Sequence, residues 1–175
     1  MCYFFTILNT GKCNMSNFND FKRESTAALA VALRWFLLAV PTGLVCGLVG
    51  TAFHLAVETV TELRGQQPWL LFLLPVAGLA ITAFYKWTKC EGVGTNNVIR
   101  AVQSGEPVSL LLVPAIFLGT VLTHLCGGSA GREGAALQMG GSIGWNVGVL
   151  LHLKDHDRRT ATISGMAAFF SALFG

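Results

Sequence analysis

Two short polar segments lie between apolar stretches of this sequence, and the residue types in both can attract a negative ion. The first segment, Cys90–Val98 (CEGVGTNNV), has two glycines that permit backbone angles other residues avoid, followed by residue types common at helix N-termini. We therefore expect a loop that leads into the N-terminus of a short amphipathic helix. A helix N-terminus presents free backbone N–H groups and a partial positive charge, and both attract anions.

The second segment, Gly127–Gly144 (GGSAGREGAALQMGGSIG), is a glycine-rich loop that carries the adjacent charges Arg132 and Glu133. Helix-forming composition resumes at Ala135, so we expect Glu133 at or just before a second helix N-terminus. Charged side chains at membrane depth are costly unless they are paired or functional. A carboxylate there can occupy the anion-attracting position, and its neutral, protonated form can leave it. Glu133 is therefore predicted to act as a gate and as a proton carrier.

Other interpretations of the two segments stay open from these residues alone. Glu133 can form an ion pair with Arg132 at a helix start in a cytoplasmic loop, and GVGTNN can be an ordinary interfacial turn. A phosphate-binding loop is disfavoured, because GGSAGREG lacks the lysine and the following serine or threonine. His152 and His156 have a spacing that can bind a metal, although a solvated loop is more common. We expect no metal site and no cofactor.

The composition indicates that membrane-embedded helices position these segments. Hydrophobic residues make up 53% of the sequence and charged residues 12%, against about 45–50% and about 25% in soluble domains, and the mean hydropathy is +0.58. The net charge of +3 is scattered, so nucleic acid is not an expected partner. The five cysteines show no metal-ligand spacing and predict neither a disulfide framework nor a metal cluster.

Five apolar stretches, several of them interrupted by proline or glycine, predict an all-α, polytopic membrane protein with broken and tilted helices. They are Thr26–Val60, Trp69–Trp87, Val108–Leu125, Ala135–Leu151 and Ala161–Phe174. The first is too long for one upright span and contains Pro41, so a tilted or kinked helix is expected. Gly43, Gly47 and Gly50 lie near one another at helical spacing, on a face where another helix can pack closely.

We expect a polar, disordered N-terminal segment, 1–25, followed by a membrane domain, 26–175. Residues 1–14 can be an extension that precedes a true start at Met15, an alternative that the sequence leaves open. Several basic residues near this end indicate a cytoplasmic N-terminus. They are Lys22, Arg23 and Arg34. The last stretch stops at Gly175 without a polar flank, so we expect the membrane domain to be incomplete at its C-terminus.

The sequence GGSAGREGAALQMGGSIG resembles the glycine-arginine-glutamate-glycine signature of the CLC family of voltage-gated chloride channels and anion/proton antiporters. GVGTNN stands where that family has its first anion-binding loop, and SGMAAFFSALFG resembles its helix leading to a small-residue loop. The resemblance covers Leu33–Gly175. It implies the first of two inverted repeats of broken helices, a homodimer in the lipid bilayer of a bacterial plasma membrane, and transport of halide-type anions and protons.

Residue by residue, the resemblance implies that Glu133 is the gating and proton-accepting carboxylate. It also implies an anion-binding set: Val93, Gly94, Thr95, Asn96, Gly131, Arg132, Gly134 and Ala135. Val93 stands where chloride-selective members usually have serine and nitrate-preferring ones proline, and valine donates no hydroxyl hydrogen bond. This departure, with alanine in place of proline after GREG, resembles the fluoride/proton antiporter branch. There the amide of Asn96 can help replace the hydration shell of fluoride, and chloride stays the alternative.

Anion transport is therefore the expected function of the full-length protein, with channel and antiporter behaviour both open. The chain alone is expected to be inactive, because the second half of the site and most of the second repeat would lie beyond Gly175. The alternative is a membrane scaffold or a defunct fragment that does not transport. An enzyme is not expected, since the sequence shows no nucleophile with a base and no metal centre at membrane depth.

Overall fold

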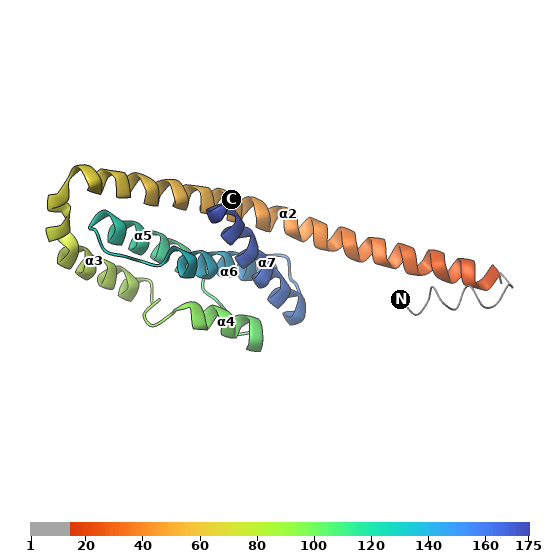
Figure 1. Ribbon diagram of the computed structural model, residues 1–175. Coiled ribbons are helices and arrows are strands. Elements are labelled where there is room, and N and C mark those ends of the chain that lie inside the picture. The colour runs from red at the N-terminus through yellow and green to blue at the C-terminus, as the bar shows by residue number, and fades with distance from the viewer. Residues whose placement is uncertain (1–14) are drawn as a thin grey trace. The chain divides into compact units, whose positions relative to one another are not determined.

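The computed structural model describes the backbone of residues 15–175 and the side chains of residues 28, 29 and 31–175. Its helices are α2 (Met15–Gln66), the 3₁₀ helix η1 (Pro68–Leu73), α3 (Leu74–Trp87), α4 (Thr95–Ser104), α5 (Leu112–Leu125), α6 (Arg132–Leu150) and α7 (Asp155–Phe174) (Figure 1). No strand occurs among the described residues, and the predicted all-α fold is confirmed. The chain divides into two units after Leu38, and the contacts below all lie within the second, Ala39–Gly175.

The first predicted segment, 1–25, coincides only in part with described structure. Residues 1–14 lie outside the described residues, and residues 15–25 have helical backbone at the start of α2. The same helix continues through Pro41, so the first predicted apolar stretch forms a single long helix.

The third predicted apolar stretch begins as an extended linker, and α5 starts later than expected, at Leu112. Polar side chains of α6 bind this linker. The hydroxyl of Ser142 donates to the carbonyl of Ser109 at 2.8 Å, and the amide nitrogen of Asn146 donates to the carbonyl of Val108 at 3.0 Å. These two bonds satisfy carbonyl groups that a helix would otherwise have paired, and they stabilise the non-helical backbone here.

Helices α6 and α7 pack closely because small residues line their contact. A Cβ atom added to Gly144 would overlap the carbonyl oxygen of Ala161, and one added to Gly165 would overlap the carbonyl oxygen of Gly140. No larger side chain fits between the two backbones. This is the packing mode of small-residue helix pairs in membrane proteins, where close approach increases van der Waals contact.

Phe53 joins α2 to two other helices of the second unit. Its ring centroid lies 5.6 Å from that of Phe117 in α5 and 6.4 Å from that of Phe169 in α7. Phe53 and Phe169 are both completely buried. Because aromatic pairs at these separations add to the stabilisation from burial, Phe53 helps to anchor this part of α2.

The predicted glycine face of α2 packs against another helix at one position among the described residues. Gly50 lies against α7, where an added Cβ would stand 2.9 Å from the Cβ of Ala172. An added Cβ at Gly43 or Gly47 would have nothing within 4 Å in the described part of the chain. The sequence correctly predicted a close helix contact at Gly50. It did not distinguish Gly50 from Gly43 and Gly47, which have no such contact in the described part of the chain.

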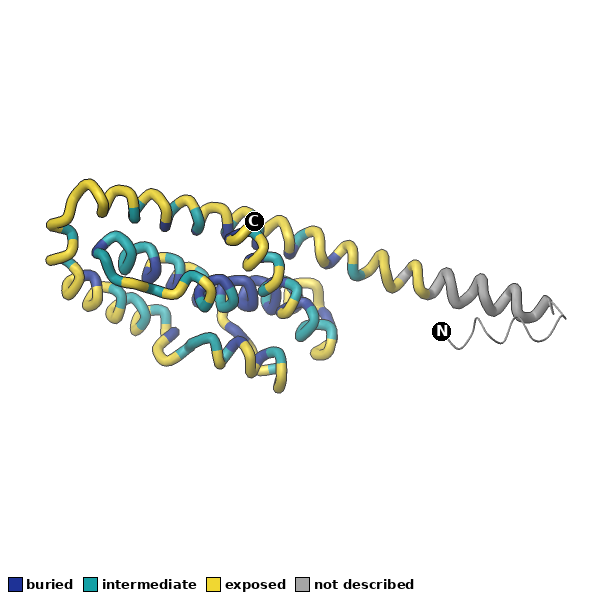
Figure 2. Tube along the Cα trace, viewed as in Figure 1, coloured by how far each residue is buried: buried dark blue, intermediate teal, exposed yellow. Residues whose placement is uncertain are grey.

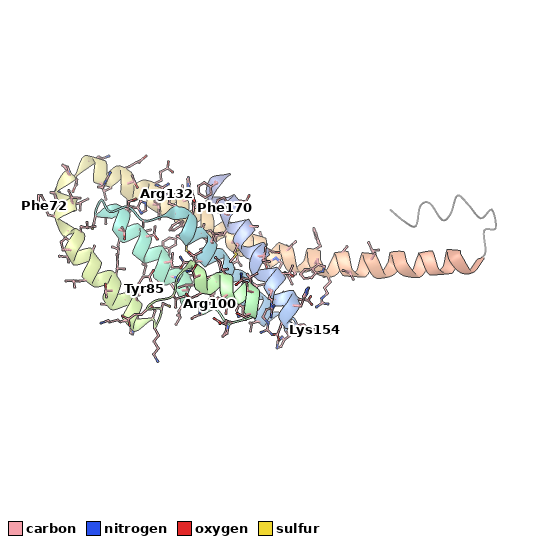
Figure 3. All side chains as sticks on the ribbon, turned by 60° about the horizontal axis from the view of Figure 1, so that its bottom comes forward. Phe72, Tyr85, Arg100, Arg132, Lys154 and Phe170 are labelled. Atoms are coloured by element: carbon pink, nitrogen blue, oxygen red, sulfur yellow. The ribbon has the colours of Figure 1, made fainter. Side chains whose placement is uncertain are left out.

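The outer surfaces of α2, η1 and α3 are apolar and exposed, whereas the deepest burial follows α6 (Figure 2). Phe72 is 85% exposed and projects from the turn between α2 and α3 (Figure 3). Two helical stretches of the described chain, Val31–Gln66 and Pro68–Trp87, are long and apolar enough to cross a membrane, and Leu112–Leu125 is a shorter apolar helix. The helices formed by the five predicted stretches therefore differ in length, as expected for broken helices.

We predict that Gly144→Ala destabilises the protein by about 1–3 kcal/mol, because the new methyl group forces α6 away from α7. Gly47→Ala is the matched control, since its methyl group meets no described atom and alanine favours the helix. Thermal unfolding of both variants in detergent, followed by circular dichroism, measures the difference. Equal midpoints for the two variants would contradict the close α6–α7 contact.

Candidate functional site

The N-termini of α4 and α6 lie against each other. The hydroxyl oxygen of Thr95, the first residue of α4, is 3.5 Å from the position that a Cβ on Gly134 would occupy in the first turn of α6. The side-chain amide nitrogen of Gln138 donates a hydrogen bond to the same Thr95 oxygen at 3.0 Å. The first N–H groups of a helix have no partner within it and carry a partial positive charge, so the positive ends of two helices lie close together here.

The start of α4 is fixed by its own sequence. Gly92 has a φ of 70°, in the left-handed region that favours glycine, and Gly94 follows in an extended conformation. The backbone N–H of Asn97 donates to the carbonyl of Gly94 at 2.9 Å, and the N–H of Gly94 donates to the side-chain oxygen of Asn97 at 3.2 Å. The predicted loop and helix start are therefore present, with Asn97 acting as the cap.

The start of α6 follows a compact glycine loop. Gly127 has a φ of 83°, and an added Cβ at Gly128 would stand 2.7 Å from the side chain of Thr123 at the end of α5. The chain then enters α6 at Arg132, with Gly131 in an extended conformation. Glu133 lies in the first turn, as predicted, and is exposed.

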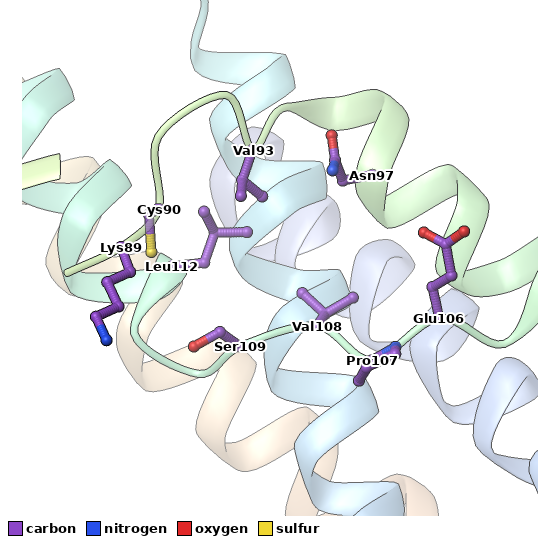
Figure 4. A pocket seen from close by; sticks show the side chains of 9 residues that line it. All are labelled: Lys89, Cys90, Val93, Asn97, Glu106, Pro107, Val108, Ser109 and Leu112. Atoms are coloured by element: carbon purple, nitrogen blue, oxygen red, sulfur yellow. The ribbon is translucent and has the colours of Figure 1, made fainter. Parts of the chain in front are cut away.

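A pocket of about 140 Å³ lies between the loop before α4 and the extended linker before α5 (Figure 4). The side chain of Val93 faces it together with Leu112 and Val108. Its polar lining includes Lys89 and Glu106. Val93 thus contributes an apolar wall at this point, and no hydroxyl group.

The remaining predicted site residues differ in their exposure. Gly94 and Thr95 are half-buried, while Asn96 is exposed on the first turn of α4. At the start of α6, Gly131 is exposed, Arg132 half-buried and Ala135 buried. The contact that joins the two groups is the one between Thr95 and Gly134.

Gln138 was not among the predicted site residues, although it bridges the two helices. Its partner Thr95 is 43 positions earlier in the chain, so no local pattern relates the two. The available signal was its position in the apolar stretch Ala135–Met139, where an amide side chain needs a hydrogen-bond partner.

Two alternative interpretations, an Arg132–Glu133 ion pair and a metal site at His152 and His156, can be compared with the structure. None of the ion pairs that the described residues form within 4.0 Å joins Arg132 to Glu133. His156 pairs with the neighbouring Asp157 at 3.6 Å, and its side chain is 92% exposed. No group of three or more His, Cys, Asp or Glu side chains in the described part of the chain is arranged to hold a metal ion.

Comparison with known proteins identifies the family. The sequence profile described as "Voltage gated chloride channel" matches residues 77–175, more than half of the chain. This chain belongs to that family. Family members are integral membrane proteins, in agreement with the two helices of membrane-spanning length. The resemblance to the CLC family and the CLC-type fold are confirmed.

Individual relatives match across much of this chain. The "Chloride/fluoride channel protein" of Pseudomonas syringae pv. tomato is 35% identical over 160 residues, which is 90% of this chain and 35% of the relative. The "H(+)/Cl(-) exchange transporter ClcA" of Cronobacter sakazakii is 34% identical over 78% of this chain and 33% of its own. The "Crystal structure of a CLC-type fluoride/proton antiporter" matches with a TM-score of 0.73 at 35% identity, over 79% of this chain and 35% of that one. The chain spans about a third of these relatives, which are channels and transporters rather than enzymes.

We predict that Asn97→Ala destabilises the protein by about 1 kcal/mol, because the N–H of Gly94 loses its acceptor. Asn97→Asp keeps the acceptor and is expected to retain the stability of the parent. Asn96→Ala, at the exposed neighbouring position, is the control and should change little. Unfolding midpoints in detergent decide the matter, and an equal loss at positions 96 and 97 would contradict the capping role.

Proposed function

We propose that the full-length protein containing this sequence moves halide-type anions across a membrane and exchanges them for protons. The main support is the contact between Thr95 and Gly134, which brings the first turns of α4 and α6 together. Two positive helix ends and several unpaired donors can replace the hydration shell of a small anion. The names of the relatives, a chloride/fluoride channel protein and H(+)/Cl(-) exchange transporters, support the same function.

Glu133 is the proposed gate and proton acceptor. It belongs to the first turn of α6, so its carboxylate competes with an anion for the same N–H groups. Its side chain is exposed and forms none of the ion pairs described above, so the carboxylate is accessible from outside the fold. Protonation removes its negative charge, and the anion can then take its place.

Fluoride is the proposed substrate, with chloride as the alternative. Val93 lines the loop before α4 with an apolar side chain and donates no hydrogen bond. An anion bound near this loop must accept its hydrogen bonds from backbone N–H groups and from polar side chains in the first turn of α4. Fluoride accepts hydrogen bonds more strongly than the other halides. The fluoride/proton antiporter that shares 35% identity supports this choice.

The remaining features of the whole protein are also proposals. We propose a homodimer in the bacterial plasma membrane, with the N-terminus in the cytoplasm. Because the chain spans about a third of its relatives, we propose that it does not transport by itself. The apolar, exposed surfaces of α2 and α3 fit contacts with lipid or with further parts of a longer protein.

We predict that Glu133→Gln abolishes proton coupling, lowering proton flux by about a hundredfold or more, because an amide cannot carry the proton. Anion movement should continue, since the substitution leaves the helix N-termini in place. The measurement uses the full-length protein in liposomes, with a fluoride electrode outside and a pH-sensitive dye inside.

Glu62→Gln is the matched control for that experiment, because Glu62 is an exposed carboxylate on α2. It should keep both fluxes at the level of the parent. Proton flux that persists unchanged in Glu133→Gln would remove the role assigned to Glu133.

A second prediction concerns the choice of anion. Fluoride efflux from liposomes should exceed chloride efflux in the parent, because the site lacks a hydroxyl at position 93. Val93→Ser introduces a hydroxyl at this position and should raise the ratio of chloride flux to fluoride flux by about tenfold. Chloride flux equal to or greater than fluoride flux in the parent would exclude fluoride as the preferred substrate.

A further inference from the structure

The hydrogen bond between Gln138 and Thr95 has a defined direction. The side-chain amide nitrogen of Gln138 can only donate, so the hydroxyl oxygen of Thr95 accepts at 3.0 Å. A threonine hydroxyl has one hydrogen to donate and can accept through its oxygen at the same time. The hydrogen of Thr95 is therefore not used in this bond and can be donated to a third group.

The position of this hydroxyl matters, because it belongs to the first residue of α4 and lies against Gly134 in the first turn of α6. A group that accepts its hydrogen would also be close to the free N–H groups of both helices. Gly134 has no side chain to fill the space beside the hydroxyl, and an added methyl group there would only touch the Thr95 oxygen.

The neighbouring polar side chains do not share this contact with α6. The oxygen of Asn97 accepts from the N–H of Gly94, and its side chain lines the pocket beside Val93. Asn96 is exposed on the first turn of α4, and Val93 has no donor. Thr95 is thus the side chain of α4 that is both close to α6 and oriented by a bond from it.

We infer that Gln138 is a positioning residue: by donating to the oxygen of Thr95, it directs the Thr95 hydroxyl hydrogen to an anion held between the N-termini of α4 and α6. The inference rests on the proposed function. A hydroxyl that already accepts one hydrogen bond becomes a stronger donor, which favours a strongly accepting anion such as fluoride.

The test is a double-mutant cycle in the full-length protein, with fluoride KM and kcat measured in liposomes and fluoride binding measured by calorimetry. Thr95→Val removes the hydroxyl with little change of shape, and it should raise the fluoride KM about tenfold or more. Gln138→Met removes the donor and should raise KM by a smaller factor. Thr95→Ser keeps the hydroxyl and should stay within about twofold of the parent.

The decisive result is the combination of the two substitutions. Adding Gln138→Met to Thr95→Val should change KM no further, because Gln138 acts through Thr95. Fully additive effects, or a Gln138→Met variant with lower thermal stability and an unchanged KM, would show a structural role only and overturn the inference. So would a Thr95→Val variant with the parent's KM, which is expected if the hydroxyl donates to Gln138 instead.

The proposed function can fail separately from this inference. A full-length parent that neither binds nor transports fluoride or chloride would contradict the proposed function and, with it, the inference. A parent that transports, combined with any of the three contrary results above, would contradict the inference alone.

Discussion

The structure depends on one constraint, that two helices begin next to each other and the first N–H groups of a helix have no partner within it. Helices α4 and α6 share this condition, and their N-termini adjoin at Thr95 and Gly134. In a membrane such groups must be satisfied by protein or by a bound ion, because lipid offers no hydrogen bonds. The meeting of two such ends gives an anion a favourable place, and every functional proposal above follows from it.

Other contacts within the second unit hold the N-termini of α4 and α6 next to each other. α4 is bound at both of its ends by other helices. Gln138 of α6 donates to Thr95 at its start, and Arg159 of α7 donates to the carbonyl of Gln103 at its end, at 2.9 Å. A cation at the C-terminus matches the negative end of the helix dipole, as an anion does at the N-terminus. The close packing of α6 on α7 therefore fixes the distance between the two helices that clamp α4.

The sequence predicted those features that are set by neighbouring residues. The glycines and the TNN triplet predicted the start of α4, and the glycine-rich loop predicted the start of α6 beside Glu133, because turns and caps depend on residues a few positions apart. The family resemblance and the all-α fold followed from motifs and composition in the same way.

Features that depend on contacts distant in the sequence could not be predicted from local patterns. The bond between Gln138 and Thr95 requires α4 to pack on α6, and composition does not specify that packing. The apolar residues of the linker before α5 suggested a helix, and the bonds from Ser142 and Asn146 hold part of this linker outside one. The glycine face of α2 likewise gave no sign that Gly50 alone would meet another helix among the described residues.

Cross-linking of Thr95→Cys with Gly134→Cys, in a background in which alanine replaces the native cysteines, tests the convergence of the two helix ends most directly. The 3.5 Å between the Thr95 oxygen and a Cβ at position 134 is short enough for a disulfide after a small adjustment. Mild oxidation in membranes should form this disulfide, whereas Asn96→Cys with Gly134→Cys, the exposed control pair, should not cross-link. A pair at positions 95 and 134 that stays reduced, or that oxidises no faster than the control pair, would contradict the meeting of the N-termini of α4 and α6 on which the anion site depends.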